Sequence, residues 1–157
     1  MDLGVGLEPW EIAVRMLLAV LCGAVLGFDR EARGKAAGLR TQTLVSLSAA
    51  ATTLVALQMY ADVAGTGHGG DVDPTRVIQG LAQAIGFISA GVMFRSGVNV
   101  RGVTTAAVVW MAGALGIACG AGLYWVAGIA LGLSVLVSIG FTWLERRLFP
   151  EGASEEE

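Results

Sequence analysis

Charged side chains are scarce in this chain of 157 residues. Asp, Glu, Lys and Arg make up 15% of it, whereas hydrophobic residues make up 55% and the mean hydropathy is +0.69. This balance excludes an ordinary soluble domain, in which about a quarter of the residues are charged. The composition is instead typical of a membrane protein.

Catalytic motifs are also missing. The single histidine, His68, has no nucleophile at a readable spacing, and the chain contains no Gly-x-Ser-x-Gly, His-Glu-x-x-His or phosphate-binding loop. The segments between the apolar runs are too short to hold a soluble catalytic domain. We therefore expect no enzymatic activity and no bound cofactor.

Cysteine occurs only twice, as Cys22 and Cys119. Cys22 lies toward the inner half of the first apolar run and Cys119 at the outer end of the fourth. Their α-carbons should therefore be too far apart for a disulfide bond. We predict two unpaired thiols that pack within the bundle.

Long apolar runs dominate what remains. Each of them is close to the ~20 residues that cross ~30 Å of hydrocarbon, and only Arg15 interrupts one of them, near its start. The sequence therefore predicts an all-α membrane protein, a bundle of five transmembrane helices that occupies residues 1–144 and is followed by a short acidic tail, 145–157. The five runs are 12–28, 41–60, 77–94, 103–119 and 121–143.

Basic residues indicate the orientation. If the N-terminus lies outside, the cytoplasmic segments are 29–40, 95–102 and the tail, and only Arg15 and Arg76 fall on the other side. Short loops rich in Lys and Arg stay in the cytoplasm. We predict an outer N-terminus and a cytoplasmic C-terminus. The cations assigned to the cytoplasm are Arg30, Arg33, Lys35, Arg40, Arg95, Arg101, Arg146 and Arg147.

Glycines are concentrated in the apolar runs, some of them at four-residue spacing. Lipid supplies no hydrophobic force between helices, so close backbone approach must supply their association. Two interpretations stay open, which are packing within one bundle and homodimerisation through one such face. The paired glycines are Gly23 and Gly27, Gly116 and Gly120, and Gly128 and Gly132.

The segment after the second run carries His68, Asp71 and Asp73. It lacks the ligand number and the glycine of a calcium loop, so we predict no metal site there. Asp73 is suited to capping the next helix, with Pro74 at the first helical position.

Charged residues are most concentrated directly after the first apolar run. Asp29 and Glu31 lie at the C-terminal end of the first predicted helix, where the helix macrodipole disfavours carboxylates. They need cationic partners, and Arg30, Arg33, Lys35 and Arg40 are within reach.

Two predicted helices begin on the same side of the membrane. Gly38-Leu39-Arg40-Thr41 begins the second and Gly102-Val103-Thr104-Thr105 begins the fourth. A helix N-terminus beside an arginine favours an anion, such as a phosphate, a lipid headgroup or a carboxylate of a partner protein. The simpler interpretation is that Arg40 pairs with Asp29 or Glu31 while the threonines only cap their helices. An ion pathway is disfavoured because no Asp or Glu lies near the middle of a span.

These motifs together resemble the MgtC/SapB family of bacterial inner-membrane proteins. The resemblance rests, in order and spacing, on five stretches: Asp29-Arg30-Glu31, Gly38-Leu39-Arg40-Thr41, Asp73-Pro74-Thr75-Arg76, Gly86 to Gly91, and Gly102 to Trp110. The family's usual Phe-Leu-Gly-Ala-Gly is here Phe87-Ile88-Ser89-Ala90-Gly91.

The resemblance implies a multi-pass protein of the bacterial inner membrane that serves as a regulator or adaptation factor in magnesium limitation, acid stress or virulence. It also implies contact with a membrane complex such as the ATP synthase, and a short form without the family's C-terminal soluble domain. From the residues themselves we expect a homo-oligomer, contact with membrane lipids and no nucleic-acid partner. A magnesium or other small-ion transporter and a scaffold without a ligand remain alternatives.

Two sets of residues carry these expectations. The predicted ligand- or partner-binding residues are Asp29, Arg30, Glu31, Gly38, Arg40, Thr41, Thr104 and Thr105. The predicted helix-packing residues are Gly23, Gly27, Gly86, Gly91, Gly116, Gly120, Gly128 and Gly132.

Overall fold

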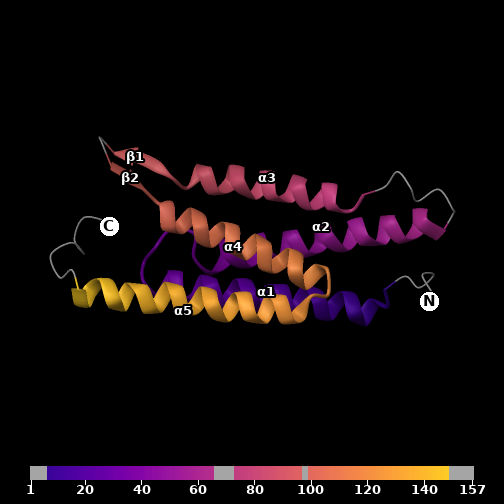
Figure 1. The fold of residues 1–157 in the computed structure, drawn as a ribbon, viewed down its shortest axis with the longest axis horizontal. Coiled ribbons are helices and arrows are strands. Elements are labelled where there is room, and N and C mark those ends of the chain that lie inside the picture. Colours follow the sequence, from indigo (N-terminus) through magenta and orange to yellow (C-terminus); the bar gives the residue numbers. More distant parts are fainter. Residues whose placement is uncertain (1–6, 66–72, 97–98, 149–157) are drawn as a thin grey trace.

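The computed structural model describes residues 7–65, 73–96 and 99–148, and these form five helices and one short hairpin (Figure 1). The helices lie side by side along the long axis of the molecule. The elements are α1 (Pro9–Ala32), α2 (Leu39–Gly65), α3 (Thr75–Gly91), β1 (Phe94–Ser96), β2 (Asn99–Arg101), α4 (Val103–Gly120) and α5 (Tyr124–Leu148).

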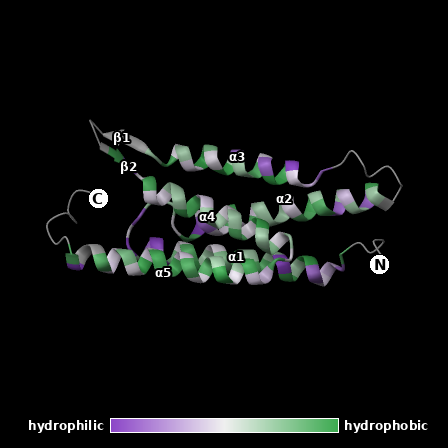
Figure 2. Cartoon of the chain, in the orientation of Figure 1, coloured by the Kyte–Doolittle hydropathy of each residue, from purple (hydrophilic) through white to green (hydrophobic). Residues whose placement is uncertain are grey.

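Four of the described helices, α1, α2, α4 and α5, are long and apolar enough to cross a membrane. Apolar residues extend along their length in Figure 2. The prediction of an all-α, membrane-spanning protein is confirmed at this level. α3 has 17 residues, fewer than the four longer helices, so the fifth span stays a prediction.

Successive helices run in alternating directions (Figure 1). The end of α1, the starts of α2 and α4, and the end of α5 therefore lie toward the same end of the bundle. α5 continues to Leu148, beyond the predicted boundary at residue 144, and the rest of the acidic tail falls outside the described residues.

A two-stranded antiparallel hairpin joins α3 to α4, which the apolar pattern did not predict. Phe94 pairs with Arg101 and Arg95 with Val100. The β-branched Val100 suits an extended backbone. Gly102 then adopts a φ of +85° directly before α4, and a Cβ there would meet the carbonyl oxygen of Val92. Glycine therefore allows the sharp turn from the hairpin into α4.

The core is built from small side chains of α1, α2 and α4. Ala19, Ala49 and Ala112 are almost completely buried, and Leu115 is the largest fully buried side chain. Residues buried inside the chain make up 56% of the apolar stretch of α4 but only 6% of that of α5. α4 is therefore the central helix, and α5 lies at the edge of the bundle.

Two of the three glycine pairs lie where helices cross. A Cβ on Gly23 would meet the backbone of Gln42 and Thr43 at 2.6–2.7 Å, and Gly27 lies as close to Leu39. On α4, Gly116 lies against the backbone of Ser46, and a Cβ on Gly120 would lie 2.6 Å from the carbonyl oxygen of Ala50. These glycines let α1 and α4 approach the backbone of α2 closely.

The remaining predicted packing glycines differ. A Cβ on Gly86 would meet the ring of Trp110 at 3.3 Å, but around Gly91, Gly128 and Gly132 no described atom lies within 4 Å of an added Cβ. Packing inside the bundle is therefore wrong for these three glycines, as far as the described residues extend. Gly128 and Gly132 are on α5, which few other elements cover.

The start of α3 is held by Asp73. Its carboxylate oxygen Oδ1 accepts hydrogen bonds from the backbone N–H of Thr75 (2.9 Å) and from the Thr75 hydroxyl (2.7 Å). These bonds lower the pKa of the Asp73 carboxyl below its usual value. The helix begins at Thr75, one residue later than predicted. His68 and Asp71 lie outside the described residues.

The two cysteines correct the sequence analysis. Both are buried free thiols, but their sulfur atoms lie only 3.9 Å apart. The expected separation is wrong because α4 is short and its C-terminal end meets α1 near the middle of that longer helix. Arg15 marks the same junction, since its Nη1 donates a hydrogen bond of 2.9 Å to the carbonyl oxygen of Gly120.

Candidate functional site

The motifs singled out in the sequence meet at one end of the bundle. There α1 ends, a short loop turns back into α2, and the β2 strand leads into α4. We call this region the basic end, defined as residues 29–41 and 101–105. It carries five of the ten cations of the chain, together with the N-termini of two long helices. Each such N-terminus adds partial positive charge.

Arg30 is the central side chain of the basic end. It is only 7% exposed, and its Nη2 donates hydrogen bonds to the Thr105 hydroxyl and to the carbonyl oxygen of Ala36 (3.4 Å). Its Nε has no described partner. One guanidinium thus links the end of α1, the loop and the first turn of α4, through neutral acceptors. A buried charge held in this way needs every hydrogen bond that it can make.

Gln42 holds the other side of the loop. It is fully buried in the first turns of α2, and its Nε2 donates a hydrogen bond of 3.0 Å to the carbonyl oxygen of Ala37, while its Oε1 has no described partner. Ala37 itself has a positive φ of 54°, which is uncommon for a residue other than glycine. Arg30 and Gln42 therefore fix two successive carbonyl groups of a strained turn.

The two carboxylates of the basic end have different partners. Asp29 forms a salt bridge of 2.9 Å with Arg33, one turn further on. Glu31 accepts a hydrogen bond of 3.0 Å from the backbone N–H of Leu39 and so caps the start of α2. The helix macrodipole favours a carboxylate at that position.

Three polar side chains point outward from this framework. Lys35, Arg40 and Thr104 are exposed, and their side chains form no hydrogen bond or ion pair with the residues that the structure describes. The expected pairing of Arg40 with Asp29 or Glu31 is wrong, because Arg33 and the α2 amide occupy these carboxylates. The exposed surface of the basic end is therefore cationic and open to an anion.

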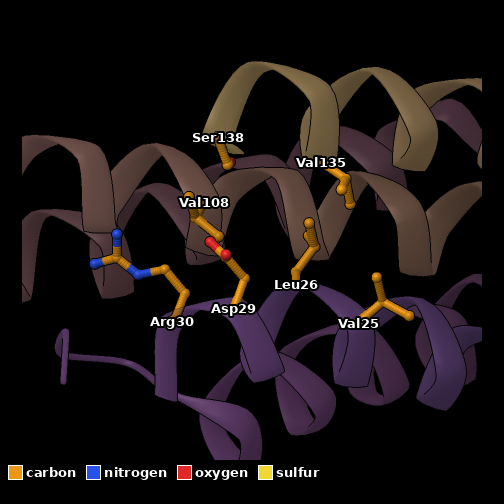
Figure 3. A pocket seen from close by; sticks show the side chains of 7 residues that line it. All are labelled: Val25, Leu26, Asp29, Arg30, Val108, Val135 and Ser138. Carbon is orange, nitrogen blue, oxygen red and sulfur yellow. The ribbon is translucent and has the colours of Figure 1, made fainter. Parts of the chain in front are cut away.

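A small cavity lies behind the salt bridge, between α1, α4 and α5 (Figure 3). It has room for about one water molecule. The Asp29 carboxylate reaches toward Val108, whereas the Arg30 guanidinium is turned to the other side. The lining residues are Val25, Leu26, Asp29, Arg30, Val108, Val135 and Ser138.

The predicted binding residues thus divide by exposure. Glu31, Arg40 and Thr104 are exposed, and Asp29, Gly38 and Thr41 are half-buried. Arg30 and Thr105 are buried against each other. In this arrangement these last two side chains bond to each other and link the loop to α4, and their contact with a partner stays a prediction.

Sequence reasoning missed Gln42 and Ser46. The Ser46 hydroxyl donates a hydrogen bond of 2.8 Å to the carbonyl oxygen of Ala19, linking α2 to α1. A signal was present, because Gln42, Ser46, Ala49 and Thr53 follow one another at helical spacing and all are buried. Such a stripe indicates the face of α2 that packs against protein.

Comparison with known proteins adds the last observation. A family model described as the MgtC family matches residues 16–147. Protein MgtC of Brucella abortus is 44% identical over 112 residues, which are 71% of this chain and 43% of that protein. The putative magnesium transporter YhiD of Escherichia coli is 37% identical over 114 residues, 73% of this chain and 53% of that protein.

The match to a further relative covers more of that relative's length. Protein SrpB of Synechococcus elongatus is 36% identical over 143 residues, 86% of this chain and 77% of that protein. The chain spans about half the length of the Brucella and Escherichia relatives. No solved structure matches it.

Proposed function

The chain belongs to the MgtC family, and on this premise we propose that it is a membrane regulator in adaptation to magnesium limitation. It acts by contact between its basic end and an acidic group of a membrane protein. We assign the basic end to the cytoplasm, because short loops rich in Lys and Arg remain on that side. The membrane is the inner membrane of a bacterium, as the family resemblance implies.

One observation supports this proposal above the others. Buried Arg30 binds the loop and α4 through Ala36 and Thr105, and its own charge is therefore unavailable to a partner. Lys35 and Arg40 remain exposed on a framework that is already fixed. A pre-organised charged surface costs little ordering entropy when it binds. Arg40 is the best placed contact, because it lies in the first turn of α2, where the helix dipole adds to its charge.

The partner is a membrane protein complex, and the family resemblance makes the ATP synthase the first candidate to test. A guanidinium such as that of Arg40 forms bidentate hydrogen bonds with a carboxylate. The match covers 43% of the Brucella relative and 53% of the Escherichia relative. The proposal therefore rests only on surfaces of the residues that the structure describes.

The test measures ATP-driven proton pumping in inverted membrane vesicles with and without the chain. We expect the chain to slow pumping, Arg40→Glu to abolish the effect, and Arg40→Lys to retain part of it. Arg76→Glu is the matched control, because Arg76 is an exposed arginine in the first turn of α3, at the opposite end of the bundle. Equal slowing of proton pumping by the wild type and by Arg40→Glu would contradict the proposal. Equal slowing by protein-free liposomes added to the vesicles would contradict it too.

Ion movement is a second candidate, favoured by the position of Asp29 at the cavity between α1, α4 and α5. Carboxylate oxygen is the ligand type that magnesium prefers. Purified protein in liposomes distinguishes the two functions. Magnesium uptake that is abolished by Asp29→Asn would favour transport, and its absence alongside slowed proton pumping would favour the regulator.

A further inference from the structure

The thiols of Cys22 and Cys119 form an isolated pair inside the bundle. Their sulfur atoms are 3.9 Å apart, on α1 and α4, and the two side chains are 8% and 1% exposed. The chain has no other cysteine. Neither side chain is needed for the basic end, which lies further along α1. The pair thus stands apart from the surface assigned to a partner.

We infer that Cys22 and Cys119 are a modification site, at which a small neutral peroxide converts the two thiols into a disulfide that joins α1 to α4. A disulfide requires the sulfur atoms to move roughly 2 Å closer, to about 2.05 Å. Both cysteines belong to the buried core cluster, and each has an alanine as a near neighbour in sequence within that cluster, Ala19 on α1 and Ala118 on α4. Cysteine has a single side-chain torsion before its sulfur, so rotation of the two short side chains can bring the sulfur atoms together.

The surroundings favour a disulfide over a metal complex. A metal complex holds both cysteines as thiolates for as long as it exists, which keeps two negative charges in the buried interior of an apolar bundle, whereas oxidation needs one thiolate at a time and only transiently. A disulfide is neutral and carries no polar hydrogen. Among the described residues no third His, Cys, Asp or Glu joins the two cysteines to complete a metal site.

We assign the first reaction with peroxide to Cys22, the less buried of the two cysteines. Cys22 is the more exposed thiol, so its sulfur attacks one oxygen of hydrogen peroxide, the O–O bond breaks, and sulfenic acid and water form. The Cys119 sulfur then attacks the Cys22 sulfur. The S–S bond forms, the S–O bond breaks, and the hydroxyl leaves as water with the Cys119 proton. Two thiols and one peroxide thus give one disulfide and two waters.

The reaction would restrict the outer end of α4. In the reduced protein Arg15 already binds the carbonyl oxygen of Gly120, next to Cys119. A covalent bond at Cys119 adds a second attachment of α4 to α1, about two turns further along α1. Oxidation therefore stiffens the junction of the two helices without changing the exposed charges of the basic end.

The test treats the membrane-embedded full chain with hydrogen peroxide, unfolds it in SDS with N-ethylmaleimide, and weighs the intact protein. We expect both thiols to become unreactive, with a mass loss of about 2 Da relative to the reduced chain and recovery with dithiothreitol. The matched control is the double variant Leu21→Cys/Cys22→Ser. It keeps two thiols at the same depth but turns one by about 100° onto an exposed position.

Proximity should make the wild type lose its thiols at least about tenfold faster than this control. Two single variants test the order of attack. Cys119→Ser should leave a sulfenic acid at Cys22 that dimedone labels, whereas Cys22→Ser should leave Cys119 unoxidised at the same dose. The inference is overturned if both wild-type thiols still react with N-ethylmaleimide, if the disulfide joins separate chains, or if the control cross-links equally fast.

Discussion

Arg30, in the last turn of α1, donates a hydrogen bond to the Thr105 hydroxyl in the first turn of α4. The contact joins residues 75 positions apart in the chain. It makes the basic end a single structural unit, because the same guanidinium also binds the carbonyl oxygen of Ala36 in the intervening loop.

Removal of this link should destabilise the protein. We expect Arg30→Ala to lower the free energy of unfolding by about 2 kcal/mol and Thr105→Val by about 1 kcal/mol, since hydrogen bonds to a buried charge are among the stronger ones. SDS titration in mixed micelles, followed by tryptophan fluorescence, measures both. The double variant should lose less than the sum of the single losses.

Arg33→Ala is the control for that cycle. Arg33 pairs with Asp29 at partly exposed positions, where an ion pair contributes only about 0.5 kcal/mol. Additive losses from Arg30→Ala and Thr105→Val would show that the two side chains act independently. A loss from Arg33→Ala as large as that from Arg30→Ala would mean that charge alone matters here.

The cap on α2 gives a second prediction. Glu31→Ala should lower stability by about 1 kcal/mol, because the amide of Leu39 loses its acceptor at the helix start. Gly38→Ala should have a similar effect, since an added Cβ would meet the Glu31 carboxylate and displace it. The same titration measures both. If Gly38→Ala lowers stability as much in a Glu31→Ala background as in the wild type, displacement of the Glu31 carboxylate is not the cause of the loss.

The glycine pairs provide a third prediction with an internal comparison. Gly116→Ala should lower stability by about 2 kcal/mol, because its Cβ would collide with the backbone of Ser46 and with the Cβ of Ala49. Gly128→Ala should cause no loss within the chain, since no described atom is near its added Cβ. Chemical cross-linking of the Gly128→Ala variant in membranes tests the alternative. Loss of a dimer there would assign that face to homodimerisation.

The capping residue of α3 makes a prediction about pH. Hydrogen bonds from Thr75 lower the pKa of the exposed Asp73 carboxyl below 3.8. The ionised form therefore stabilises the first turn of α3 above that pH, and this contribution is lost as the pH falls through the lowered value. Hydrogen-exchange protection in that turn, measured relative to the intrinsic exchange rate at each pH, should fall in acid in the wild type but not in Asp73→Asn.

Thr75→Val checks the cause of that shift. Valine keeps the shape of the side chain but removes the hydroxyl donor, so the Asp73 pKa should rise toward its usual value. A carboxyl titration by NMR measures it directly. An unchanged midpoint would assign the shift to the backbone N–H of residue 75 and to the neighbouring Arg76 instead.

Much of the fold could be predicted from the apolar runs. The run 103–119 became α4, Val103–Gly120, almost without change, because apolar length alone specifies a buried helix in a membrane protein. The hairpin between α3 and α4 was missed, since strands of three residues are too short to show a period of two.

The site was harder to predict than the fold. The sequence located the basic end because Asp29, Arg30 and Arg40 cluster in the chain. It could not assign their partners, since the exposure of Arg40 and the burial of Arg30 depend on where α4 lies. The cysteines show the same limit. Their distance depends on how far α4 extends along α1, a tertiary property that neither helix encodes alone.

The two last helices differ in length as well as in burial. α4 has 18 residues and α5 has 25, so at 1.5 Å per residue they measure about 27 Å and about 37 Å. α4 is sheltered by its neighbours, but α5 presents most of its large apolar side chains outward, including Trp125 and Leu136. In a thin bilayer α5 must therefore incline to keep those side chains in hydrocarbon. The thickness of the surrounding lipid thus acts on the tilt of α5 relative to α4, the shortest of the four helices long enough to span.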